Sequence, residues 1–182
     1  MNEDPPLLPN DLPLPNPFSP QDVQQILKDR SWSPDPPSSE QVAWIERATA
    51  LLGPQAADLA AFAELLSLVF HYDAHQVLET IDAHVVLSRY AARDVVRQLA
   101  LLLLENGALT TNRFREIVTS LKESLGMRGR ELFHPLRLAL AGRSGEGGLD
   151  RVILLLDEAA SAFPERVKTA RERIVEFCAA LD

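Results

Sequence analysis

The chain has 182 residues, of which 46% are apolar and 24% are charged, so its composition predicts a folded globular body and excludes a disordered chain. Its single cysteine, Cys178, excludes an internal disulfide, and its longest apolar run, 99–104, is too short to span a bilayer. The acidic, proline-rich start is unlike a secretory signal, and we therefore expect a soluble cytoplasmic protein.

The net charge of −8 is distributed unevenly along the chain. Residues 113–151 carry eight basic and five acidic side chains, whereas the segments before and after them are acidic. A polyanion would be attracted to this one segment and repelled by the rest, which would orient a bound nucleic acid. The alternative interpretation is that arginine and lysine simply coat exposed helix faces.

Residues 1–19 are predicted to form an extended arm. Seven of the thirteen prolines lie within residues 1–20, and proline fixes φ and removes a backbone donor. Apolar residues between the prolines could lay the arm over the body or dock it on a partner, and the third alternative is a mobile tail.

About nine helices joined by short loops are expected in the remaining chain. Ser19 before Pro20 and Asp22, and Ser38 before Gln41, have the pattern of helix N-caps. Apolar residues recur at spacings of three and four, and no segment alternates with period two, so no sheet is expected. The helices are expected over about 20–30, 38–52, 59–69, 73–89, 91–105 and 111–125, from near Pro135 to Gly142, around 152–156, and over 164–181.

Two of these helices have informative apolar patterns. The helix over 91–105 is apolar nearly all round at its end and is expected at the centre of the bundle. The helix over 164–181 carries a narrow apolar seam, which could close a homodimer or dock a partner helix. We place a boundary at 107, which gives helical subdomains 20–107 and 108–182.

No pattern of catalytic or metal-binding residues is found. His71 and His75 are the one candidate metal pair, and no third ligand has a convincing spacing. The sequence contains neither a P-loop nor a GxGxxG fingerprint. We therefore predict no enzyme activity, no metal and no cofactor.

Residues 129–142, GRELFHPLRLALAG, resemble the "GK-x-LF-x-PLR-x-AL-x-G" segment of bacterial glutamyl-tRNA synthetases. The segment 45–52 resembles that family's "L-x-x-R-x-x-T-L" helix, Tyr72-Asp73 resembles its "YD" pair, and 111–126 fits its next-to-last long helix. Roughly residues 20–158 can be laid along the family. The resemblance implies the all-α fold of the anticodon-binding region of this class I synthetase.

The resemblance also implies a tRNA-binding module without catalytic activity. Sequences like the "HIGH" and "KMSKS" nucleotide-binding signatures of the synthetase are absent. Because the chain opens with Met1 and has no room for a catalytic half, we expect a free-standing anticodon-binding region. Its implied partners are the anticodon arm of a glutamate or glutamine tRNA and a truncated synthetase that lacks this half.

The residues implied in RNA binding are Arg47, the turn at 146–150, and the arginines of that region, which could hold the RNA backbone. An arginine at the position of Arg47 can contact the third anticodon base in the family. The family's "x-PGLF" turn, which packs against splayed anticodon bases, is replaced here by residues 146–150, EGGLD, which lose the stacking ring and add negative charge. The candidate RNA-binding residues are Arg47, Arg128, Arg130, Arg137, Arg143, Gly147, Gly148, Leu149 and Arg151.

A second hypothesis assigns the chain to another functional class. The net charge of −8, the altered turn, the proline-rich arm and the amphipathic last helix favour a protein-interaction or regulatory module that kept the helical scaffold and lost tRNA binding.

Overall fold

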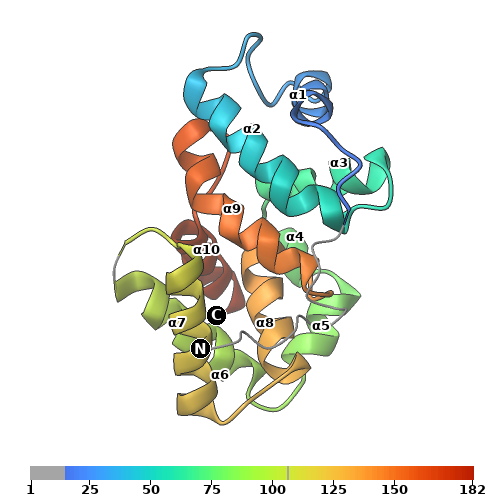
Figure 1. Cartoon of the computed structure of the whole chain (residues 1–182). Coiled ribbons are helices and arrows are strands. Elements are labelled where there is room, and N and C mark those ends of the chain that lie inside the picture. Colours follow the sequence, from blue (N-terminus) through green and yellow to red (C-terminus); the bar gives the residue numbers. More distant parts are fainter. Residues whose placement is uncertain (1–14, 106) are drawn as a thin grey trace, which may run out of the picture.

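The computed structural model describes residues 15–105 and 107–182, and within them it contains ten α-helices, one 3₁₀ helix and no strand (Figure 1). The predicted all-α fold is confirmed. The helices are α1 (Pro20–Asp29), α2 (Ser39–Leu52), η2 (Gly53–Gln55), α3 (Leu59–Phe70), α4 (Ala74–Leu78), α5 (Ile81–Leu87), α6 (Ala92–Glu105), α7 (Thr111–Leu125), α8 (Arg130–Ala141), α9 (Gly148–Ala162) and α10 (Ala170–Leu181).

Most helix ends follow the local signals in the sequence. Ser19 and Ser38 cap α1 and α2 through the predicted capping boxes with Asp22 and Gln41. Gly126 and Gly142 end α7 and α8 at φ values of 65° and 79°. This left-handed conformation is open to glycine because it has no Cβ, so the C-cap needs that residue.

Three predicted boundaries were wrong. The segment 73–89 is divided into α4 and α5 because Thr80 caps a new helix. α8 begins earlier than expected, so Pro135 lies inside the helix and not at its start. α10 begins later than Pro164 because Thr169 and Glu172 form a capping box.

α6 is covered on only part of its circumference, so its predicted central position was wrong. Leu99 and Leu103 are buried, whereas Leu101 is 56% exposed and Leu104 is 38% exposed. The helix packs on α7, α8 and α10. An unbroken apolar run does not reveal how many neighbours a helix has, and here one face remains in solvent.

The upper and lower parts of the bundle in Figure 1 are connected by α9, which packs against α2 and α3 and also against α8. Near the chain start, Asn16 donates from Nδ2 to the Thr49 carbonyl at 2.9 Å, and the Phe18 ring lies 4.9 Å from that of Phe62. Residues 15–18 therefore lie on α2 and α3, and residues 1–14 of the predicted arm are outside the described residues. The boundary at 107 stays a prediction.

The apolar seam of the last helix lies inside the protein. Val167, Ala170, Ile174 and Phe177 are each at most 5% exposed, because α4, α6 and α8 of the same chain pack on α10. The expectation of a homodimer or partner helix docked on the seam of 164–181 is therefore corrected, since the apolar surface is already buried.

A buried arginine joins the ends of two helices to α10. Arg173 is 0% exposed, and its Nη1 donates to the carbonyls of Leu68 and Leu140 at 2.9 Å each, while Nη2 donates to that of Val69 at 2.6 Å. These carbonyls belong to the last turns of α3 and α8, where no intrahelical donor remains and the helix dipole is negative. Burial lowers the pKa of Arg173 to about 10, so the guanidinium is charged at neutral pH.

Tyr72 completes this arrangement. Its ring lies 4.7 Å from the guanidinium carbon of Arg173, and its hydroxyl donates to the Ala139 carbonyl at 2.5 Å. Burial raises the pKa of the Tyr72 hydroxyl, so the phenol remains a neutral donor. Arg173 and Tyr72 thus satisfy two of the free carbonyls at the end of α8.

We expect Arg173→Ala to lower the free energy of unfolding by about 3–5 kcal/mol, because three buried carbonyls lose their charged donor. Arg173→Lys should also be destabilising, since one ammonium group lacks the planar fork that reaches both helix ends. The measurement is urea unfolding followed by circular dichroism. Arg171→Ala, at an exposed position of the same helix, is the control; an Arg173→Ala protein as stable as this control would contradict the assignment.

Candidate nucleic-acid interface

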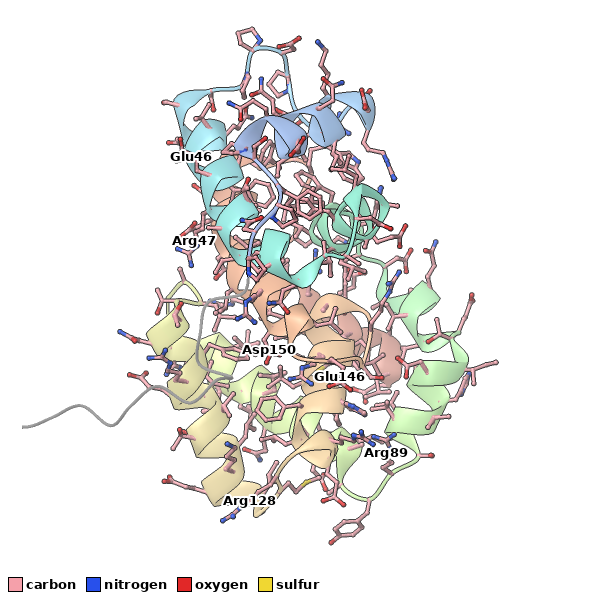
Figure 2. The ribbon with its side chains drawn as sticks, turned by 45° about the vertical axis from the view of Figure 1, so that its right-hand side comes forward. Glu46, Arg47, Arg89, Arg128, Glu146 and Asp150 are labelled. Atoms are coloured by element: carbon pink, nitrogen blue, oxygen red, sulfur yellow. The ribbon has the colours of Figure 1, made fainter. Side chains whose placement is uncertain are left out.

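The predicted RNA-binding residues do not form one cluster. Figure 2 shows Arg47 on α2, Arg128 in the segment after α7, and Glu146 and Asp150 between these two places. Arg137 lies in α8, and the glycines of the predicted turn lie at the start of α9. Residues 142–147 join the end of α8 to the start of α9. This loop is therefore the centre of the candidate site.

Arg137 is bound within the protein by the altered turn. Its Nε and Nη2 donate to the two carboxylate oxygens of Asp150 at 2.7 and 3.0 Å, and its Nη1 donates to the Gly145 carbonyl at 3.0 Å. The side chains of the pair are 11% and 23% exposed. The guanidinium also lies over the Phe133 ring, 4.8 Å from its centroid. Such a planar, two-pronged pairing fixes the geometry of the turn as well as neutralising both charges.

This ion pair changes the interpretation of the turn. The negative charge of Asp150, which sequence alone suggests would repel phosphate, is neutralised by Arg137. Gly147 is the N-cap of α9 and Gly148 its first residue, and both are partly exposed. Leu149 is only 8% exposed and packs in the core. The turn therefore exposes main-chain atoms at the N-terminal end of α9, and the buried Leu149 side chain holds the turn on the core.

The remaining arginines differ in what they contact. Arg143 is 3.2 Å from the Glu64 carboxylate in an exposed pair, which adds little stability and can open. Arg128 and Arg130 are exposed, and Arg151 is half-buried. Within residues 15–105 and 107–182, none of these last three forms an ion pair. Their charge is consequently available to an anionic ligand.

Arg47 lies at a separate surface hollow of about 460 Å³. Its Nη1 is 2.6 Å from Oε1 of Glu158 in α9, and both side chains are partly exposed. Asp157, also at the hollow, accepts the N–H groups of Leu109 and Ala170 at 2.6 and 2.9 Å and so fixes the neighbouring backbone. Arg47 is therefore held at the rim of a rigid hollow by one exposed carboxylate.

Sequence reasoning missed one basic cluster. Arg89, just after α5, lies with Nη1 2.8 Å from Nδ1 of His134 in α8. Burial, followed by the charges of Arg89, Arg137 and Arg130, lowers the pKa of His134. Because 45 residues separate Arg89 from His134, no helical spacing could have indicated the contact.

Metal and membrane sites were also sought within the described part of the chain. His71 and His75 are both exposed, and no group of three or more His, Cys, Asp or Glu side chains there is arranged to hold a metal ion. None of the helices in this part combines the length and the apolar character needed to cross a bilayer.

A double-mutant cycle would measure the interaction between Arg137 and Asp150. We expect Arg137→Ala and Asp150→Ala to be coupled by about 1–3 kcal/mol of unfolding free energy, because each mutation alone leaves a partly buried charge without its partner. Urea unfolding of the two single variants, the double variant and the unmodified protein gives this value. Strictly additive effects would show that the pair does not hold the turn.

Comparisons with known proteins agree on one family. A family model described as "Anticodon binding domain" matches residues 20–172. Glutamate–tRNA ligase 2 of Syntrophus aciditrophicus (strain SB) is 30% identical over 128 residues, which cover 70% of this chain and 25% of that protein. Glutamate–tRNA ligase of Sulfurihydrogenibium sp. (strain YO3AOP1) is 34% identical over 70 residues, covering 38% of this chain and 13% of the ligase. No solved structure matches the chain.

The chain thus spans about a quarter or less of the length of these relatives. The matched region contains the whole of α1–α9, together with the turn, the basic cluster and the hollow beside Arg47. The resemblance inferred from residues 129–142 is confirmed by this match. The all-α fold and the extent of the match together place the chain in the anticodon-binding domain family, with similarity to glutamate–tRNA ligases.

Proposed function

We propose that this chain is a non-catalytic module that binds the anticodon arm of a tRNA, with glutamate and glutamine tRNAs as the candidate ligands, in the cytoplasm where tRNA is charged. The observation that carries the proposal is the pair Arg128 and Arg130, which are exposed and lie within the region that matches the family. Arginine suits phosphate because its fork donates two hydrogen bonds to one anion.

The charge distribution supports a localised mode of binding. Net charge is −8 for the chain, and the segment 113–151 that contains both arginines has a net charge of +3. An RNA loop would be attracted to this segment and repelled elsewhere, so electrostatics would orient it before close contacts form. Affinity should therefore depend strongly on salt.

The turn would contribute backbone contacts to the same ligand. The N-terminal end of α9 carries the positive end of a helix dipole, which favours an anion. The N–H groups of Leu149 and Asp150 there already donate to the carbonyls of Glu146 and Gly147 at 3.1 Å each. Gly147 leaves this backbone open, whereas the Gln55 side chain packs against Gly148. Arg137 is assigned a positioning role, because its donors to Asp150 and Gly145 hold the turn in place.

Arg47 is proposed to read a base rather than a phosphate. Its guanidinium could form two hydrogen bonds with a base edge, or stack on a base, once it leaves Glu158. Because that carboxylate is 51% exposed, opening the pair has a small energetic cost. The hollow beside Arg47 would then accommodate one unstacked base.

We also propose a protein partner. Since the matched region corresponds to only part of the length of the glutamate–tRNA ligases, recognition by this chain would act together with a catalytic fragment on the same tRNA. Glutamylation by a catalytic fragment, measured with and without this chain, would detect such cooperation; an unchanged rate would exclude it.

Binding to a labelled anticodon stem-loop of glutamate tRNA tests the main proposal. We expect fluorescence polarisation to show binding that weakens strongly between about 50 and about 200 mM salt. Arg128→Glu and Arg130→Glu should each weaken it and lower the salt slope by about one unit. Absence of binding at the lower salt concentration would exclude the proposal and favour a protein-interaction module.

A swapped third anticodon base tests Arg47. We expect the unmodified protein to discriminate against the swap by about 1–3 kcal/mol, and Arg47→Ala to lose this discrimination while retaining salt-sensitive binding. Glu158→Gln removes the competing carboxylate and should bind at least as tightly as the unmodified protein. Equal discrimination by Arg47→Ala would assign the reading of this base to other residues.

A further inference from the structure

The turn between α5 and α6 exposes an aromatic ring. Tyr90 is 94% exposed, the largest exposed fraction among the large hydrophobic side chains of the described residues. An exposed tyrosine beside arginine is the combination by which proteins stack unpaired bases and hold the adjoining phosphates. Arg89, its neighbour in sequence, is also exposed and faces α8 through His134.

The backbone fixes the position of this turn. Ala91, directly after Tyr90, has φ = 58°, a left-handed conformation that costs free energy for any residue with a Cβ. Hydrogen bonds hold it, because the Ala92 N–H donates to the Arg89 carbonyl at 3.3 Å and the Val95 N–H to the Ala91 carbonyl at 3.0 Å. The exposed ring therefore projects from a defined backbone and not from a free end.

The charges around the turn favour an anion. Arg89 and Arg130 flank His134, and Arg137 is nearby but is neutralised by Asp150. Asp82, the one acid whose charge acts on His134, already accepts two hydrogen bonds from Ser144, from its N–H at 3.0 Å and its hydroxyl at 2.6 Å. Arg89 and Arg130 therefore place two positive charges near His134, against the one negative charge of Asp82.

The same hydrogen bonds connect the start of α5, the helix that leads into this turn, with the candidate RNA site. Ser144 belongs to the loop 142–147 that leads into α9, and Asp82 lies at the start of α5. α5 has seven residues and is therefore about 10 Å long, so Tyr90 lies roughly one short helix away from that loop. A few loop nucleotides could bridge this distance.

We propose that Tyr90 stacks on an unpaired base of the RNA while Arg89 and Arg130 hold its phosphates, so that the α5–α6 turn is a second contact point for the ligand. This inference rests on the proposed tRNA-binding function and assigns that function a contact outside the segment 113–151. Every base has a π-face, so this contact adds affinity without selecting a sequence.

The test uses the full chain and the labelled anticodon stem-loop of glutamate tRNA. We expect Tyr90→Ala to weaken binding about 5- to 100-fold and Tyr90→Phe to stay within about twofold, because stacking needs the ring and not the hydroxyl. Arg89→Glu should weaken binding and lower the salt slope by about one unit. Arg166→Glu makes the same charge change at an exposed position lining the hollow beside α1 and should have little effect.

The outcomes separate this inference from the proposed function. If the unmodified protein and Arg166→Glu do not bind the stem-loop, the proposed function fails, and this inference fails with it. If both bind and Tyr90→Ala binds equally well, only the inference is overturned. The inference would also be overturned if Arg89→Glu lost RNA binding while Tyr90→Ala bound fully, because the turn would then make a charge contact without stacking. Thermal melting followed by circular dichroism should be unchanged for all four variants, since the positions are exposed.

Discussion

The arrangement of the candidate site depends on the buried guanidinium of Arg173. α3 and α8 end close to one another, and their last carbonyls present two negative helix ends in the protein interior. The charged group of Arg173 lies between these ends and donates to both, while Tyr72 donates to another carbonyl of α8. Because residue 142 follows α8 directly, fixing the end of that helix also fixes the start of the loop that leads to α9. A contact in the core thereby positions surface residues it does not touch.

Local signals in the sequence were sufficient for most of the fold. Ser19, Ser38, Gly126 and Gly142 each determine a helix end through bonds or dihedral angles within a few residues, and these ends were predicted. The division of the segment 73–89 was missed although Thr80 carries the same kind of signal, because apolar spacing continued across the break. The covered seam of α10 could not be predicted, since periodicity identifies an apolar face but not which helices pack on it.

The candidate site was less predictable because its contacts join distant residues. The family resemblance indicated the arginines, and it could not say that Asp150 would bind Arg137, 13 residues away, through two hydrogen bonds. Sequence alone suggested that the altered turn had gained repulsive charge. The structure pairs Asp150 with Arg137, whereas Glu146 is exposed and forms no ion pair within the described residues. Arg89 and His134 are separated by 45 residues, and neither stands at a specified position of a motif. Electrostatic character is a property of the folded surface, and composition reports only its sum.

A chain with a negative net charge can present a basic surface where its carboxylates are paired with basic side chains. Arg137 neutralises the charge of Asp150 through two hydrogen bonds. Asp82 and Asp157 accept hydrogen bonds from neutral donors, which hold these carboxylates in place and leave them charged. Arg128 and Arg130, in contrast, have no ion pair within the described residues, and Arg89 contacts a histidine instead of a carboxylate. The net charge of −8 therefore does not exclude RNA binding, because it counts charged side chains equally whether or not they are in ion pairs. Which charged side chains are paired within the protein, and not the total charge, determines where a polyanion can approach.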